Sequence, residues 1–213
     1  KGKTVVRADC TGMAAHSSLA PLAVNAVHLA CALVSAIPSR QQSIIETGTH
    51  DEAYNIPYTT LHVGRIEGGV QVNIVPQEAS LEFEIRNLAG DDPAILIEAI
   101  TQDIAPVIAA AQKTSPEADI RLTVVNSYPG LETALDERVV ALLQDLTGVN
   151  ATCKVAFGTE GGLFARDLGI PTVVCGPGSM DQGHKPDEFV TVEQLAICDQ
   201  MLDGLTARLQ AGL

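Results

Sequence analysis

The stretch 78-EASLEFEIR-86 carries the clearest structural signal in the chain. Apolar residues alternate with polar ones along it: Ala79, Leu81, Phe83 and Ile85 against Ser80, Glu82, Glu84 and Arg86. Successive side chains of a β-strand point to opposite faces, so this period of two predicts a strand with one buried face. Such strands are typical of antiparallel sheets that pack one face on a core.

The residues on both sides of this strand extend the pattern. We expect further strands at 4–9, 59–66 and 120–124. A helix is expected over 25–37 and should end at Pro38, and a second should start at Asp92-Pro93 and be kinked or shortened at Pro106. The order β-α-β-β-α-β predicts a ferredoxin-like layer of two helices on a four-stranded antiparallel sheet. Its exposed sheet edge would favour pairing with a second copy.

The character of the sequence changes at Tyr128. We expect a helix from Asp136, a strand at 154–157, a glycine-rich break at 158–162, a short helix, a strand at 171–175 and a last helix capped by Thr191 and Gln194. Two or three strands make a poor independent domain. We therefore predict a boundary between 1–127 and 128–213, with the second part completed by strands upstream of Lys1. The chain opens on Lys rather than Met, as expected for part of a longer gene product.

Composition restricts the class of protein. The 213 residues include 26 Asp and Glu against 13 Lys and Arg, a formal charge of −13, which argues against binding to nucleic acid or anionic membranes. No apolar run approaches the ~20 residues of a membrane span. The five cysteines are widely spaced and contain no C-x-x-C, which favours a reducing cytoplasm over a disulfide framework.

Two of the five histidines stand where function is plausible. His16 lies where a strand should end and a helix begin, so a rigid turn could present its imidazole as a hydrogen-bond donor. His184 follows a predicted strand and a run of glycines, where it could ligate a metal ion or only cap backbone groups of a turn. His28, His50 and His62 are expected to be structural.

Other polar residues allow both a functional and a structural interpretation. Asn73 and Arg86 could reach a substrate, or be a solvated amide and a surface ion-pairing partner. The run Gly158-Thr159-Glu160-Gly161-Gly162 does not fit the spacing of a phosphate-binding loop. Glu160 near a helix start could simply stabilise that helix.

Several motifs occur together in one order: GMAAHSS at 12–18, GRIEGG at 64–69, NIVP at 73–76, FEIR at 83–86, FGTE at 157–160, CGPG at 175–178 and HKPDE at 184–188. In this order the chain resembles the acetylornithine deacetylase-like members of the zinc-dependent family that also includes aminoacylases and carboxypeptidase G. The resemblance covers nearly the whole chain, and the last block is its most specific part.

The resemblance implies a role for each candidate residue. His184 matches a zinc ligand, and His16 matches a lid histidine that reaches the partner subunit's active site and supports the oxyanion. Asn73 and Arg86 match lid positions that hold the substrate, while Gly158, Thr159, Glu160 and Gly161 match a loop that lines the pocket. The implied protein is a homodimer joined through its ferredoxin-like lid, with two Zn²⁺ ions per site and Co²⁺ as a substitute.

The resemblance also implies an activity, the cytoplasmic removal of acetyl groups from N-acetylornithine in arginine biosynthesis. The chain departs from the family because it contains no H-x-D and no Glu-Glu pair, which the family uses for its metals and its general base. We therefore expect these 213 residues alone to be inactive. A relative acting on another N-acyl amino acid or dipeptide, and a non-enzymatic amino-acid-binding module, remain alternatives.

Overall fold

The computed structural model describes residues 1–179, 181–183 and 185–212. The chain forms two compact units. Unit 1 consists of Lys1–Leu131 together with Cys153–Leu163, and unit 2 consists of Glu132–Thr152 together with Phe164–Leu213. The boundary that we predict after residue 127 remains a prediction.

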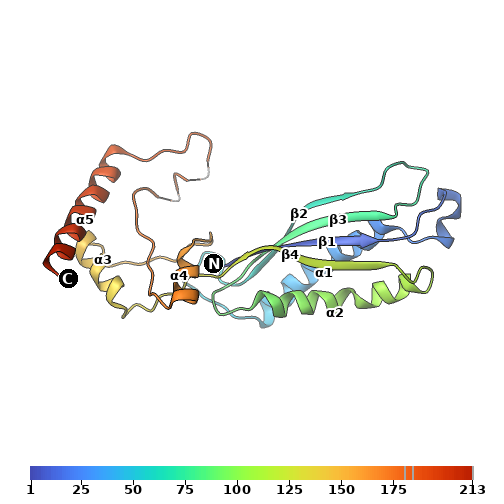
Figure 1. Ribbon diagram of the computed structural model, residues 1–213, viewed down its shortest axis with the longest axis horizontal. Helices are drawn as coiled ribbons and strands as arrows, with labels where there is room; N and C mark the ends of the chain where they lie inside the picture. Colours follow the sequence, from blue (N-terminus) through green and yellow to red (C-terminus); the bar gives the residue numbers. More distant parts are fainter. Residues whose placement is uncertain (180, 184, 213) are drawn as a thin grey trace. The chain divides into compact units, whose positions relative to one another are not determined.

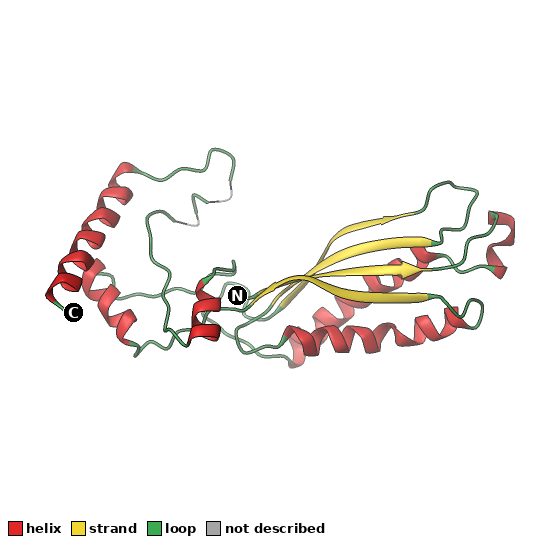
Figure 2. Ribbon diagram, viewed as in Figure 1, coloured by secondary structure: helices red, strands yellow, loops and turns green. Residues whose placement is uncertain are grey.

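Unit 1 is built on one antiparallel sheet, drawn as the yellow strands of Figure 2. Its strands are β1 (Lys3–Thr11), β2 (Thr60–Gly68), β3 (Glu78–Arg86) and β4 (Asp119–Tyr128). They lie in the order β2-β3-β1-β4, and each neighbouring pair is antiparallel. The predicted strand at 78–86 is confirmed with the same bounds, and it lies inside the sheet, where both of its edges are paired.

Two long helices, α1 (Ala26–Thr47) and α2 (Pro93–Gln112), pack on the same face of this sheet (Figure 1). The alternating side chains of β3 explain this arrangement, because its apolar set points into the core. Leu81, Phe83 and Ile85 are at most 1% exposed and pack with Leu33 of α1 and Ile100 of α2. Each such side chain contributes about 2 kcal/mol by leaving water, so this one face stabilises the whole layer.

The prediction that the first helix ends at Pro38 is wrong, because α1 continues to Thr47. Proline inside a helix removes one backbone hydrogen bond. Contacts beyond Pro38 compensate: Ile44 is buried, Arg40 pairs with Asp103 at 2.7 Å, and the Gln41 side chain accepts a hydrogen bond from the Leu61 amide at 2.7 Å. Helix α2 likewise continues past Pro106 to Gln112.

Helix starts follow the capping signals of the sequence. The Asn25 side chain accepts hydrogen bonds from the Val27 and His28 amides at the start of α1, and Asp92 caps α2 in the same way. Among the described residues only α2 has the length and mean hydropathy of a membrane-crossing helix. Its Ile100 and Ile104 belong to the core of unit 1, which accounts for part of this apolar composition.

Unit 2 contains α3 (Arg138–Thr147), most of α4 (Gly161–Leu168) and α5 (Val192–Ala211). The predicted capping pair is confirmed, since Thr191 and Gln194 form reciprocal bonds at the start of α5. The strands predicted at 154–157 and 171–175 are absent, as both segments are irregular. A strand needs a neighbouring strand for its hydrogen bonds, and no strand of the described chain pairs with either segment.

Candidate functional site

Two loops meet at the end of the sheet where β1 stops and β3 begins. In the loop that follows β1, Gly12 is required, because a Cβ at that position would lie 2.2 Å from the carbonyl oxygen of Val24 in the same loop. The loops are joined by backbone bonds from the Ser17 amide to the Asn73 carbonyl at 3.0 Å and from the Val75 amide to the Ala15 carbonyl at 2.8 Å. The structure thus brings His16 and Asn73 together, and both are exposed.

The imidazole of His16 is oriented by its own turn. Its Nδ1 accepts a hydrogen bond from the Ser18 amide at 3.3 Å and lies 2.8 Å from the Ser18 hydroxyl. A backbone amide can only donate, so Nδ1 must be the acceptor and the proton of the neutral ring belongs on Nε2. The turn therefore leaves an exposed N–H that can donate to a ligand.

Arg86 lies at the other end of the same sheet, as the last residue of β3. Its Nε donates to Glu84, whose other carboxylate oxygen lies 3.4 Å from Lys3. At a strand rise of about 3.3 Å per residue, β3 separates this end from the His16 end by roughly 25 Å. One copy of the chain therefore cannot bring His16 and Arg86 to the same small molecule.

The glycine-rich segment belongs to unit 1. Gly158 is required there, because a Cβ would lie 1.9 Å from the ring of Tyr128, the last residue of β4. Tyr128 pairs with Lys3 across the sheet, so the segment lies at the Arg86 end. The Thr159 hydroxyl accepts from the Gly161 amide at 3.3 Å, Gly161 is buried and Glu160 is exposed.

An ion pair fastens this segment to the body of unit 1. The Lys154 ammonium donates to Asp51 at 2.6 Å and lies over the Tyr54 ring, 5.6 Å from its centroid. The hydrogen bond from Lys154 holds the pKa of Asp51 below its usual value. This anchor and the Tyr128 contact keep 158–161 at one end of the sheet.

The predicted metal ligand, His184, lies outside the described residues. Within the part of the chain that is described, no three His, Cys, Asp or Glu side chains are grouped to hold a metal ion. The described His, Cys, Asp and Glu residues therefore do not form the predicted zinc site by themselves.

Sequence reasoning missed the residues that position the candidates. Ser18 orients His16, Tyr128 supports Gly158, and Lys154 with Asp51 anchors the segment that contains Thr159. For Ser18 a signal was available, because a polar group two residues after a histidine can bond its ring. The other contacts join residues distant in sequence, and no local pattern marks them.

The comparisons with known proteins agree with the fold. The family model of the M20 peptidase dimerisation domain matches residues 1–111. Acetylornithine deacetylase of Myxococcus xanthus is 28% identical over 215 residues, which cover 100% of this chain and 54% of that protein. Acetylornithine deacetylase of Salmonella heidelberg is 34% identical over 182 residues, 84% of this chain and 45% of that protein.

Solved structures share the architecture. A tripeptidase from Staphylococcus aureus superposes with a TM-score of 0.74 at 23% identity, over 94% of this chain and 50% of that one. An M20 family metallo-carboxypeptidase from Sulfolobus solfataricus superposes with a TM-score of 0.58 at 17% identity, over 93% of this chain and 56% of that one. At these identities the likeness shows the fold alone.

The chain spans about half the length of the curated relatives it matches. The family model covers more than half of the 213 residues, from β1 to the end of α2. The mixed α/β fold with its antiparallel four-stranded sheet agrees with that match. The chain therefore belongs to the M20 peptidase family and carries its dimerisation domain.

Proposed function

We propose that this chain is part of a metal-dependent amidohydrolase that removes the acetyl group from N-acetylornithine. In this proposal residues 1–127 are a ferredoxin-like lid, and 128–213 complete a catalytic domain whose other part lies outside the chain. The names of the relatives, acetylornithine deacetylases at 28–34% identity, support the substrate. The pathway would be arginine biosynthesis and the compartment the cytoplasm.

One observation carries the proposal. The candidate residues fall into two groups at opposite ends of one sheet: His16 with Asn73, and Arg86 with 158–161. A single active site that uses both groups must take them from two copies of the chain. A dimerisation domain supplies the second copy, which supports a homodimer whose subunits complete each other's sites.

The geometry suggests what each group does. The Nε2–H of His16 from the partner copy would donate to the oxyanion that develops on the amide carbonyl. Arg86 would hold the substrate carboxylate with its planar fork of donors. Thr159 and Glu160 would line the pocket beside it. Asn73 of the partner copy would enter the active site together with His16, because the same two loops hold both residues.

The proposed activity needs metal ligands that the described residues do not supply. We propose His184 as one ligand of a two-zinc site, with Co²⁺ as a substitute, and the remaining ligands would come from the part of the protein that the relatives have in addition. When bound, such ions polarise a carbonyl and activate water. The residues of this chain would bind, orient and stabilise the substrate.

The test is subunit complementation in an intact protein that contains this chain. His16→Ala and Arg86→Ala would each abolish most hydrolysis of N-acetylornithine as separate homodimers. When the two variants are mixed and exchange subunits, half of the dimers are mixed and each has one complete site. Activity should then recover to about a quarter of the wild-type value.

The matched control mixes His16→Ala with Asn73→Ala, which alter the same end of the sheet and should give no recovery. If verified mixed dimers of His16→Ala and Arg86→Ala stay inactive, the two-copy site is wrong. If the intact wild-type protein hydrolyses other N-acyl amino acids or dipeptides but not N-acetylornithine, the substrate is wrong.

A further inference from the structure

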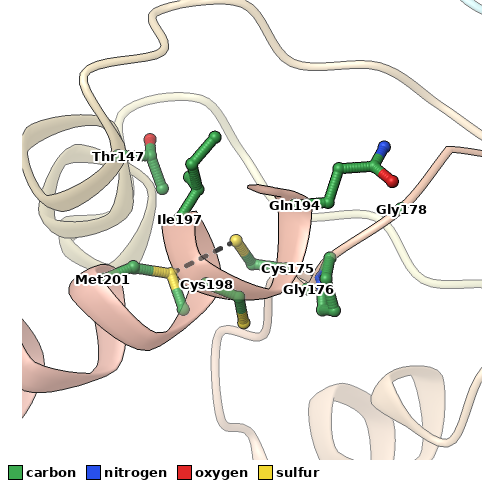
Figure 3. A pocket seen from close by; sticks show the side chains of 9 residues that line it. Thr147, Cys175, Gly176, Gly178, Gln194, Ile197, Cys198 and Met201 are labelled. Atoms are coloured by element: carbon green, nitrogen blue, oxygen red, sulfur yellow. Dashed lines mark hydrogen bonds between the residues drawn. The ribbon is translucent and has the colours of Figure 1, made fainter. Parts of the chain in front are cut away.

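Three residues that carry sulfur line one cavity in unit 2, at a place to which the proposed function assigns no role. Cys198 and Met201 lie three residues apart on α5, and therefore on one face of that helix. Cys175 faces them from the irregular segment 171–175. Its Sγ lies 3.5 Å from the Sδ of Met201 (Figure 3). All three residues line a cavity of about 180 Å³.

The rest of the lining offers little to a hard cation. It includes the apolar side chains of Ile197 and Pro177, and the described lining residues contain no carboxylate and no imidazole. Gln194 and Thr147 carry the side-chain oxygens of the lining, but the Gln194 Oε1 already accepts from the Thr191 amide at 2.9 Å and the Thr147 hydroxyl donates to the Leu143 carbonyl at 2.7 Å. Magnesium and calcium require several oxygen ligands, and structural zinc usually takes four nitrogen or thiolate ligands.

Thiolate and thioether ligands instead suit a soft cation. Sulfur donors select Cu(I) over harder divalent ions, and Met supplies a polarisable thioether. Cys175 is exposed and Cys198 is partly exposed, so an ion can reach both thiols, whereas Met201 is buried at 8% exposed. A Cβ added at the neighbouring Gly176 would meet nothing within 4 Å, so there is free space beside Cys175.

We propose that Cys175, Cys198 and Met201 form a site for one Cu(I) ion. Binding would form two copper–thiolate bonds and one copper–thioether bond. The two thiols would release their protons to water, and the copper would keep its oxidation state. The site would lie in unit 2 and is independent of the proposed hydrolysis.

The experiment uses the 213-residue chain without oxygen. The chain would compete for Cu(I) with bicinchoninate in the presence of ascorbate, and X-ray absorption would count the sulfur neighbours. We expect one tightly bound ion per chain with three sulfur ligands. Cys175→Ser and Cys198→Ser should each lose the tight ion, while Met201→Leu should weaken binding roughly tenfold and leave two sulfur ligands.

The control is the double variant Cys31→Ser and Cys153→Ser, which removes two exposed thiols outside the cavity and should bind copper as the parent does. Circular dichroism would show that each variant keeps its helices. Retention of the tight ion in Cys175→Ser or Cys198→Ser overturns the site. An unchanged affinity and sulfur count in Met201→Leu, or equally tight binding of Zn²⁺, also contradicts it.

Discussion

At the scale of single residues, His16 shows how a short turn orients an imidazole. The Ser18 amide occupies Nδ1 and so directs the ring proton to Nε2. The exposed N–H is available to a ligand without any movement of the backbone.

His16→Ala in the intact protein should therefore lower kcat by about 10²–10³, the usual cost of losing one oxyanion donor, and leave the bound metal unchanged. His184→Ala should instead reduce the bound zinc. Metal analysis and steady-state kinetics would separate the two roles. His28→Ala, on the exposed side of α1, is the control and should change neither quantity. Equal loss of metal from His16→Ala and His184→Ala would contradict this division.

Cys10 is a second residue for which the structure predicts a chemical property, the low reactivity of its thiol. It is 2% exposed on β1, and burial raises the pKa of its thiol to about 11, assisted by Asp9 and Asp119. At pH 8 iodoacetamide should modify exposed Cys31 and leave Cys10 intact, as measured by mass spectrometry of the peptides. The neutral thiol contributes to stability below its unfolded pKa of 9.0, and that contribution disappears as the pH rises towards 11. Rapid alkylation of Cys10 in the native state would show that β1 opens.

At the scale of elements, capping side chains decide where helices begin. Asn25 accepts from two amides of α1, at 2.9 Å and 3.2 Å, and directly follows the loop that carries His16. Asn25→Ala should cost about 1 kcal/mol in the free energy of unfolding measured with urea. Asn25→Asp keeps the acceptor and should retain most of the stability. Equal destabilisation by both substitutions would show that the cap is not the cause.

The ion pair between Asp51 and Lys154 joins two distant stretches of unit 1. Because the folded pKa of Asp51 is depressed, the pair stabilises the fold above the usual pKa of 3.8 and is lost as the pH falls below it. We expect amide hydrogen exchange in 153–158, relative to the intrinsic rates at each pH, to accelerate in that acidic range. Asp51→Asn should accelerate it already at pH 7, whereas the exposed neighbour Glu52→Gln should not. Unchanged exchange in Asp51→Asn would mean that the ion pair does not hold the segment.

At the scale of the whole molecule, the open edges of the sheet matter most. Within the described part of the chain, strands β2 and β4 each have one unpaired edge, and such edges readily pair with another chain. The match to a dimerisation domain strengthens the same expectation. Light scattering should give twice the 22.3 kDa of the chain. A monomer at high protein concentration would contradict dimerisation by the residues present here.

The sequence-based predictions were right where a feature depends on residues close together in the sequence, and wrong where it depends on contacts between distant residues. The strand at 78–86, the helix start at Asp92 and the capping pair at Thr191 depend on neighbours in the sequence, and the structure confirms them. The end predicted at Pro38 was wrong, because contacts with other elements outweigh one missing hydrogen bond. The strands predicted at 154–157 and 171–175 were wrong because apolar character alone supplies no pairing partner.

The sequence by itself determined the alternation that buries one face of the sheet, the starts of the helices and the family to which the motifs belong. These features are local, since each depends on residues within a turn or a strand. Only the tertiary structure decided that His16 and Asn73 share one end of the sheet while Arg86 and Gly158 share the other. The physical reason is that antiparallel pairing sets which ends of distant strands coincide, and no spacing along the chain records that choice.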